Sequence, residues 1–326
     1  MTGYEQMIAK ANTPPLVWVV DSTYTGELHA RIGLAERLGY GYQVIPLPNG
    51  NSIAYQQDLY QRYCQHGQAR QLLVISGTGE ETTAEIADLR GLFKERFFCV
   101  YLASILPEQQ HPRLAEYDLI ASPQLSGKHI VTLTGVPHAL TLDGLARARL
   151  LHADYFNALP KPIVALLVGG NTRYCEGFTV HHAQQLAARI LTISNGLGGC
   201  LDITNSRRTP PVAFAALLGA LADVPHYVFD WQQTDSDFYP ALLAHADVFV
   251  VTGDSLSMCS EAAFTGKPLL VDLSTNATEC FHRQIIGRLI DYGAAKLLAS
   301  PYTAWSYVPP DPTGAVAEAI KTHLRI

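Results

Sequence analysis

The sequence contains few charged residues and no run of charges of one sign. Only 16% of its 326 residues are Asp, Glu, Lys or Arg, and 23 basic against 29 acidic residues give a formal net charge of −6. A protein that holds nucleic acid through general electrostatics carries a basic excess or a basic cluster. The charge pattern therefore argues against a nucleic-acid partner.

The sequence also lacks paired cysteines, a leader-like beginning and a long apolar run. Its six cysteines are scattered without a C-x-x-C pair, which predicts reduced thiols and a cytoplasmic setting. The first residues lack the basic-then-apolar order of a signal peptide. The longest apolar stretch, 213–222, is too short to span a bilayer. We therefore expect a soluble protein, with peripheral membrane contact left open.

Short apolar runs that end in polar or glycine-containing loops recur along the whole chain. Segments of helical composition follow several of them, so the pattern predicts an α/β fold with parallel sheets and helices on both faces. Ligands then belong at the carboxyl ends of the strands. The expected strands are 16–20, 72–75, 97–102, 118–121, 129–134, 163–168, 200–204, 226–229, 248–251 and 269–273, and the expected helices are 27–38, 84–93, 141–159, 180–193, 212–221, 257–264 and 315–325.

The length and the 48% hydrophobic content allow two cores. The segment Leu159-Pro160-Lys161-Pro162 has the composition of a rigid linker. We therefore predict two Rossmann-like domains whose sheets face a cleft: residues 1–159 on the acceptor side and 160–302 on the donor side. The remainder, 303–326, should form a tail helix that packs across the domains, with membrane contact through Val316, Ile320 and Leu324 as the alternative.

The corner between the expected strand 248–251 and helix 257–264 is the most informative loop. Asp254, Ser255 and Ser257 lie where free backbone N–H groups and the positive end of a helix dipole should face one space. Such a corner binds anions. Met258 follows within the first turn of the helix, and Glu261 lies one turn after Ser257. Glu261 could accept hydrogen bonds from two ribose hydroxyls, and a solvated helical glutamate is the alternative.

Three further loops contain residues that suit a nucleotide diphosphate. Gly169-Gly170-Asn171 would let a diphosphate approach the backbone, because glycine lacks a Cβ, although a tight turn explains it equally. Ser206-Arg207-Arg208-Thr209 offers forked donors for phosphate oxygens, with surface ion pairs as the alternative. Asp230 and Trp231 could contact a base, or Trp231 could simply be packed.

Several of these runs resemble the mitochondrial-fission ELM family, whose members are similar to two-domain, GT-B-type glycosyltransferases. The resemblance is carried by GGNTRY, LDITNSRRTPP, FDW and ADVFVVTGDSLSMCSEAAFTGKPLLVD, and in the first half by DLIASPQ and TLTGVPHALT. The family usually has a Gly-Lys-Pro-Gly-His type of loop after its first strand, where this chain has the different run from Asp21 to Glu27. The resemblance implies a nucleotide-sugar donor, of the UDP type, held by Gly169, Gly170, Arg207, Arg208, Ser255, Ser257 and Glu261.

A transferase of this kind would displace a nucleoside diphosphate from the anomeric carbon by a hydroxyl of a glycan or lipid-linked envelope acceptor. Arg207, Arg208 and the helix start at Ser257 would neutralise the leaving diphosphate, so we expect neither a metal nor another cofactor; no metal-ligand spacing occurs in the sequence. The general base would come from the first half. His138, which should titrate near neutral pH, is the first candidate and Asp21 the second, and a loop hydrogen bond is the alternative for both.

Two other functions were weighed. The string Gly253-Asp254-Ser255-Leu256 matches the GDSL serine hydrolases, and 223–226 supplies a D-x-x-H. That family has the serine block early and the D-x-x-H late, the reverse of the order here, so we treat the match as accidental. The second alternative is a non-catalytic protein that keeps a nucleotide site and recruits partners.

Overall fold

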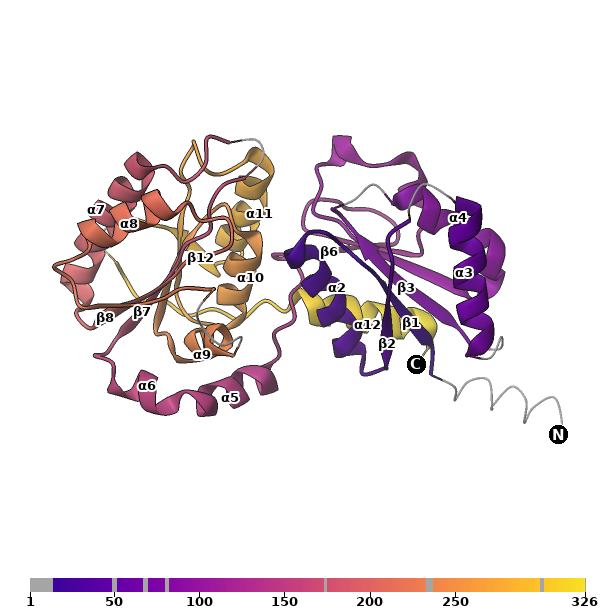
Figure 1. Ribbon diagram of the computed structural model, residues 1–326, viewed down its shortest axis with the longest axis horizontal. Coiled ribbons are helices and arrows are strands. Elements are labelled where there is room, and N and C mark those ends of the chain that lie inside the picture. Colours follow the sequence, from indigo (N-terminus) through magenta and orange to yellow (C-terminus); the bar gives the residue numbers. More distant parts are fainter. Residues whose placement is uncertain are drawn as a thin grey trace. The chain divides into compact units, whose positions relative to one another are not determined.

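The computed structural model describes residues 14–48, 52–66, 70–79, 82–172, 175–232, 237–299 and 302–325. The chain divides into two compact units. Unit 1 comprises 1–139 and 311–326, and unit 2 comprises 140–310. Each unit contains a six-stranded sheet in which every neighbouring pair is parallel, with helices packed on both faces (Figure 1). The predicted α/β architecture with two Rossmann-like sheets is confirmed.

Unit 1 has the strand order β2-β1-β3-β4-β5-β6. Its four inner strands, β1, β3, β4 and β5, are buried along their whole length, as expected where helices cover both faces of a parallel sheet. One face packs on α3 and α4, and the other on α2 and α12. The elements are β1 (Leu16–Val20), α2 (Thr25–Leu38), β2 (Tyr42–Ile45), α3 (Ser52–Gln65), β3 (Leu72–Gly77), α4 (Thr83–Phe93), η1 (Lys94–Arg96), β4 (Phe97–Leu102), η2 (Pro107–Gln109), η3 (Pro112–Glu116), β5 (Leu119–Ser122), β6 (Ile130–Thr132) and α12 (Pro312–Leu324).

Unit 2 has the strand order β12-β11-β10-β7-β8-β9. Helices α7 and α8 lie side by side on one face of its sheet, and α5, α6, α9, α10 and α11 contribute to the core on the other (Figure 1). The elements are α5 (Leu142–Leu151), α6 (Ala153–Ala158), β7 (Ile163–Leu167), α7 (Val180–Leu197), β8 (Cys200–Thr204), α8 (Pro211–Ala220), β9 (His226–Phe229), α9 (Phe238–His245), β10 (Val248–Thr252), α10 (Leu256–Phe264), β11 (Leu269–Asp272), α11 (Cys280–Asp291) and β12 (Ala295–Leu297).

The division between the units differs from the predicted one. The helix expected over 141–159 is two helices, α5 and α6, which meet at His152. Leu145 and Phe156 from these helices are buried in the same core as Leu242 of α9. Because this burial ties α5 and α6 to the second sheet, unit 2 begins at Leu140 and not after residue 159.

The C-terminal segment does not pack across the domains as a single tail. Residues 303–310 belong to unit 2, whereas α12 belongs to unit 1. Val316 and Ile320 are fully buried against α2, and Asp311 forms an ion pair of 2.6 Å with Arg37 of α2. The apolar side of α12 is therefore part of a core and is not available for a membrane. Within the described ranges, no helix combines the length and apolarity that crossing a membrane requires.

Besides the short 3₁₀ helices η1, η2 and η3, three α-helices and two strands of the described ranges were not predicted: α3, α9, α11, β2 and β12. The two strands are short and lie at sheet edges, where two residues of each stay exposed and the apolar pattern is weak. Helix α7 also runs to Leu197, through the glycine-containing segment expected to turn, and the chain reverses only at Gly198 and Gly199, which have positive φ.

Asp202 of β8 gives unit 2 a buried acid with few partners. Its side chain is fully buried, the Tyr155 hydroxyl lies 3.5 Å from Oδ2, and Oδ1 has no hydrogen-bond partner. Burial raises the pKa of Asp202 to about 7, with the Tyr155 hydrogen bond opposing the shift. The folded protein therefore favours the protonated carboxyl. Ionisation of this group lowers the stability of the fold.

We predict that Asp202→Asn gains stability relative to the parent protein as the pH rises. An aspartate in the unfolded chain has a pKa of about 3.9. The free energy of unfolding of the parent therefore falls as the pH rises from about 4 to about 7, by about 1.4 kcal/mol for each unit of difference between the two pKa values. Urea denaturation of both proteins at pH 5 and pH 8 measures the difference. A stability difference that is the same at both pH values would contradict the prediction.

Candidate functional site

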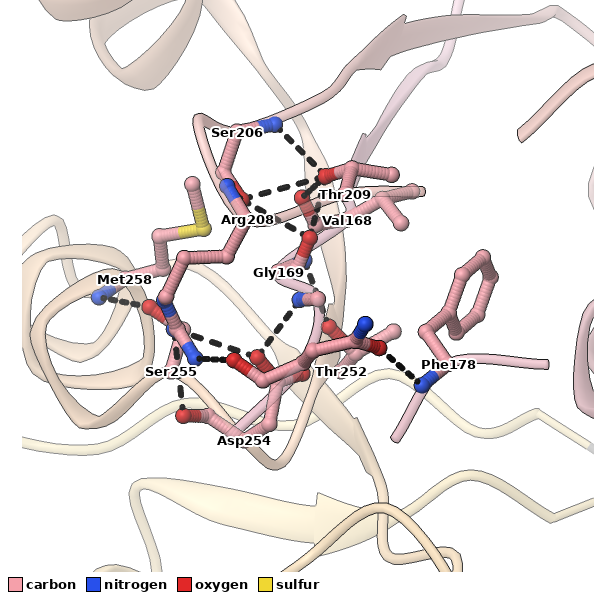
Figure 2. A network of polar contacts seen from close by, with 12 residues as sticks. Val168, Gly169, Phe178, Ser206, Arg208, Thr209, Thr252, Asp254, Ser255 and Met258 are labelled. Carbon is pink, nitrogen blue, oxygen red and sulfur yellow. Dashed lines mark hydrogen bonds and ion pairs between the residues drawn. The ribbon is translucent and has the colours of Figure 1, made fainter. Parts of the chain in front are cut away.

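Three loops of unit 2 meet at the carboxyl edge of its sheet. Strands β7, β8 and β10 are parallel neighbours, so the loops that follow them begin at the same edge. These loops contain Gly169-Gly170-Asn171, Ser206-Arg207-Arg208-Thr209 and Asp254-Ser255, and Figure 2 shows the polar contacts that join them. We call this place the β7/β8/β10 corner. The predicted convergence of these motifs at one sheet edge is what the fold produces.

Hydroxyl groups connect the loops through the backbone of Gly169. Thr252 Oγ1 accepts a hydrogen bond of 2.7 Å from the Gly169 N–H, and Ser206 Oγ donates one of 2.8 Å to the Gly169 carbonyl. Thr209 Oγ1 donates to the carbonyls of Val168 and Gly169 and accepts from the Ser206 N–H (Figure 2). Ser206 and Thr209 therefore build the corner, and their hydroxyls are already engaged within it.

Asp254 lies at the centre of the corner. Its side chain is only 2% exposed, and Oδ2 accepts a hydrogen bond of 2.7 Å from the Gly170 N–H. The same oxygen lies 3.2 Å from Nη2 of Arg208. Burial raises the pKa of Asp254, while the Arg208 charge and the hydrogen bond from Gly170 oppose the shift. The carboxylate is thus a buried anion supported by the Arg208 cation and by hydrogen bonds from the Gly170 N–H, the Thr252 hydroxyl and its own backbone N–H.

The two arginines of the β8 loop have different surroundings. Arg208 donates to the Asn171 carbonyl at 2.8 Å and to the Asp254 carbonyl at 3.4 Å, and its own carbonyl accepts from the Asn171 N–H. Arg207 is exposed, and within the described part of the chain it has no ion pair or hydrogen bond. Arg208 thus forms the ion pair that was the alternative, with Asp254 as its partner. Arg207 is the exposed cation of this loop.

The two glycines are required by the corner itself. A Cβ on Gly169 would collide with the Asp254 carboxyl, and one on Gly170 would collide with the backbone of Arg208. Both N–H groups are also bonded within the protein. The close approach that glycine permits is here an approach of protein groups, and contact between these glycines and a diphosphate stays a prediction.

Helix α10 begins at the corner with a capped first turn. Ser255 is the N-cap, and its Oγ accepts from the Met258 N–H at 3.5 Å. The Met258 side chain packs on the core of unit 2. Ser257 is half-buried, and no side-chain hydrogen bond is recorded for it among the described residues. The first N–H groups of a helix have no partner within it. The Met258 N–H is taken by Ser255, so among the described residues the N–H groups of Leu256 and Ser257 and the Ser257 hydroxyl remain available donors.

Glu261 is not the solvated helical glutamate that was the alternative. Its carboxylate accepts a hydrogen bond of 2.8 Å from the Tyr239 hydroxyl of α9. Burial raises the pKa of Glu261 to about 7, and the Tyr239 hydrogen bond opposes the shift. The acid is therefore held in a fixed position one turn into α10, which suits a hydrogen-bond acceptor.

Asp230 and Trp231 follow β9, the next strand at this edge. The Trp231 N–H donates to Asn205 Oδ1 at 3.0 Å, and its side chain is 42% exposed, so it is not the packed core tryptophan of the alternative. Asp230 Oδ1 accepts from the Gln232 N–H at 2.9 Å. These contacts connect the β9 loop to the β8 loop and leave the indole open.

The two candidate bases lie in unit 1. Asp21 Oδ1 accepts from the Ser22 N–H at 2.7 Å, which is the loop hydrogen bond of the alternative. His138 is buried after β6, and the Thr313 hydroxyl bonds both its N–H and its carbonyl. Burial lowers the pKa of His138 to about 4. His138 therefore does not titrate near neutral pH as expected, because burial favours the neutral ring.

One residue near the corner was not predicted. His282 lies in the first turn of α11, its Nδ1 is buried without a hydrogen-bond partner, and burial together with the charge of Arg208 lowers its pKa to about 4. The sequence around it gave no strand or motif signal that would have singled it out. Its proximity to Arg208 arises from the packing of α10 on α11.

The hydrolase alternative finds no support in the geometry. The Ser255 hydroxyl is occupied as the cap of α10 at the carboxyl end of β10. His226 of the D-x-x-H begins β9, at the opposite end of a strand three places away in the sheet. Over the described ranges, no group of three or more His, Cys, Asp or Glu residues is placed to hold a metal ion.

A family model described as Mitochondrial fission ELM1 matches residues 25–324. The chain belongs to this family. Mitochondrial fission protein ELM1 of Arabidopsis thaliana is 28% identical over an alignment of 285 residues that covers 77% of this chain and 64% of that protein. The chain therefore spans less than two thirds of the length of this relative.

The fold of this ELM1-family protein is that of GT-B glycosyltransferases and related sugar-nucleotide enzymes. MurG of Acinetobacter baumannii superposes with a TM-score of 0.53 at 14% identity, covering 96% of this chain and 91% of that one. UDP-GlcNAc 2-epimerase of Methanocaldococcus jannaschii superposes with a TM-score of 0.60 at 12% identity, covering 95% and 100%. At these identities the similarity shows the fold alone.

We predict opposite effects for two Gly→Ala substitutions in this ELM1-family protein. Gly169→Ala should lower the free energy of unfolding by about 1–3 kcal/mol, because the new methyl meets the Asp254 carboxyl. Gly219→Ala, in α8 with open space around it, should raise it by up to about 1 kcal/mol through helix propensity. Urea denaturation tests both, and equal effects would contradict the assigned packing.

We predict that the two neighbouring arginines contribute differently to stability. Arg208→Ala leaves the buried Asp254 carboxylate without its cation and should cost about 1–3 kcal/mol, less than for a fully buried pair because Arg208 is 37% exposed. Arg207→Ala should stay within about 0.5 kcal/mol of the parent, as an exposed side chain without partners. Denaturation midpoints compare the variants, and a larger loss for Arg207→Ala would reverse the assignment.

Proposed function

We propose that unit 2 binds a nucleotide sugar, of the UDP type, and that the protein transfers the sugar to a glycan or lipid-linked acceptor without a metal. The observation that carries this proposal is the β7/β8/β10 corner, where the exposed Arg207 of the β8 loop and the half-buried first turn of α10 both lie at the carboxyl edge of one parallel sheet. Helix starts and arginine side chains are the usual protein ligands of phosphate.

The corner separates groups that build the site from groups that face a ligand. Ser206, Thr209, Asp254 and the two glycines are bonded to one another. The diphosphate would then lie against Arg207, the outer edge of Arg208 and the N–H groups and hydroxyl at Ser257. Arg208 and Asp254 together are electrically neutral, so Arg207 supplies the net positive charge that the leaving diphosphate requires.

The nucleoside would extend from the diphosphate along α10 and toward β9. Glu261, which accepts a hydrogen bond from Tyr239, would accept hydrogen bonds from the ribose hydroxyls. Trp231 leaves its indole exposed beside the β8 loop, where it can stack on a base. Glu261 and Trp231 would make these contacts while keeping their hydrogen bonds to Tyr239 and Asn205.

We assign the acceptor and the general base to unit 1 and not to unit 2. Asp21, at the carboxyl end of β1, is retained as the general base because it sits at the edge where ligands of parallel sheets bind. The alternative function is recruitment of a partner by a nucleotide-bound but non-catalytic protein, which the name of the Arabidopsis relative as a fission protein favours.

The proposal predicts a nucleotide-specific rise in melting temperature in buffer containing EDTA. A ligand that binds only the folded state stabilises it by about 2.7 kcal/mol at one hundred times Kd. We expect one of UDP-, GDP-, ADP- or dTDP-sugars to raise the Tm, and Arg207→Ala and Glu261→Gln to abolish the shift.

The matched control is Gly219→Ala, which changes α8 and should keep the shift. If every nucleotide leaves the Tm of the parent unchanged, the donor site does not exist. If a nucleotide sugar binds but is not consumed with any offered glycan or lipid-linked acceptor, the recruitment alternative gains over transfer.

A further inference from the structure

The β7/β8/β10 corner contains a negative charge as well as positive ones. The Asp254 side chain is buried, yet it lies behind the Arg208 guanidinium at 3.2 Å and accepts the Gly170 N–H at 2.7 Å. Its position is fixed from a second side, because the missing Cβ of Gly169 provides its space. An anion that reaches the outer edge of Arg208 therefore shares that cation with a resident carboxylate.

The contacts of the Arg208 guanidinium hold it beside the Asp254 carboxylate. The guanidinium is held by the Asn171 carbonyl, the Asp254 carbonyl and the Asp254 carboxylate, which belong to two of the three loops. The Arg208 side chain is 37% exposed, and both of its η nitrogens contact oxygen atoms of the protein. A bound phosphate would approach a cation whose charge is already balanced, and the field of the carboxylate reaches it through Arg208.

A nucleotide sugar and the nucleoside diphosphate left after transfer differ in charge. Both phosphates of the donor are esterified, and each carries one negative charge. The free diphosphate ends in a monoester-like group whose second pKa is about 6, so at pH 8 it carries about one more negative charge than the donor. A fixed negative charge near the terminal phosphate therefore disfavours the product more than the donor.

We propose that Asp254 is a specificity-determining residue that acts through Arg208 and makes the corner prefer the diester diphosphate of a nucleotide sugar over the more highly charged free nucleoside diphosphate. This inference rests on the proposed function. It gives a reason for a buried acid in an anion site: the donor binds, and the product is not trapped by an excess of positive charge. Arg207 remains the cation that meets the charge developing on the leaving group.

The experiment measures the Kd of UDP and UDP-GlcNAc, and of GDP and GDP-mannose, at pH 8 by calorimetry. It compares the parent protein, Asp254→Asn and Asp202→Asn. An asparagine at 254 keeps an oxygen for the Gly170 N–H and removes the charge. Asp202→Asn is the matched control, because it makes the same change at a buried carboxyl of β8 that has no contact with Arg208.

We expect Asp254→Asn to bind the free diphosphate about tenfold more tightly than the parent and the nucleotide sugar only about threefold more tightly, because the terminal phosphate of the sugar carries half the charge. The ratio of the two Kd values should stay within twofold of the parent in Asp202→Asn. A purely structural role for Asp254 would weaken both ligands together, because a distorted loop serves neither, and this result would overturn the inference.

Two further outcomes are decisive. If a nucleotide pair binds the parent and Asp254→Asn leaves its Kd ratio unchanged, the inference is wrong while the donor site stands. If no nucleotide binds the parent, the proposed function fails and this inference fails with it. Should Asp254→Asn not fold, the parent decides alone: free UDP binding more than tenfold tighter than UDP-GlcNAc would show that no selection against the extra charge exists.

Discussion

The contact between Asp254 and Arg208 is the constraint on which the rest of the corner depends. One carboxyl oxygen takes the Gly170 N–H, and the guanidinium that it faces also holds the Asn171 carbonyl. Three loops from three strands are thereby fixed by two side chains. Because the Asp254 carboxylate is withdrawn from water, loss of Arg208 leaves a buried charge without its cation.

This constraint divides the polar residues of the corner by role. The hydroxyls of Thr252, Ser206 and Thr209 form hydrogen bonds with the backbone of the β7 loop. Their bonds keep the start of α10, Ser257 and Arg207 at the surface of the corner. A rigid set of internal bonds beneath a few open donors is the arrangement expected of a site that must hold a phosphate in one position.

The two units show how burial changes the chemistry of a residue. His138 and His282 are both histidines whose pKa is lowered to about 4 by burial, and Glu261 is an acid whose pKa is raised to about 7. In each, the low polarity of the surroundings favours the neutral form. His138 is consequently a structural residue of unit 1, joined to α12 through Thr313, and Glu261 a fixed acceptor joined to α9.

The sequence by itself determined the α/β class, most strands and the loops that carry the polar residues. Apolar runs such as those of β4, β8 and β9 are local patterns with the right bounds, and the ELM1 motifs are contiguous runs. Helices α5 and α6 were expected in the first domain and α12 across both domains, because their partners, α9 and α2, are distant in the chain. Which arginine is paired, why Gly169 has no side chain, and where His282 lies were decided only by tertiary structure, since each depends on the distance between loops that no local pattern encodes.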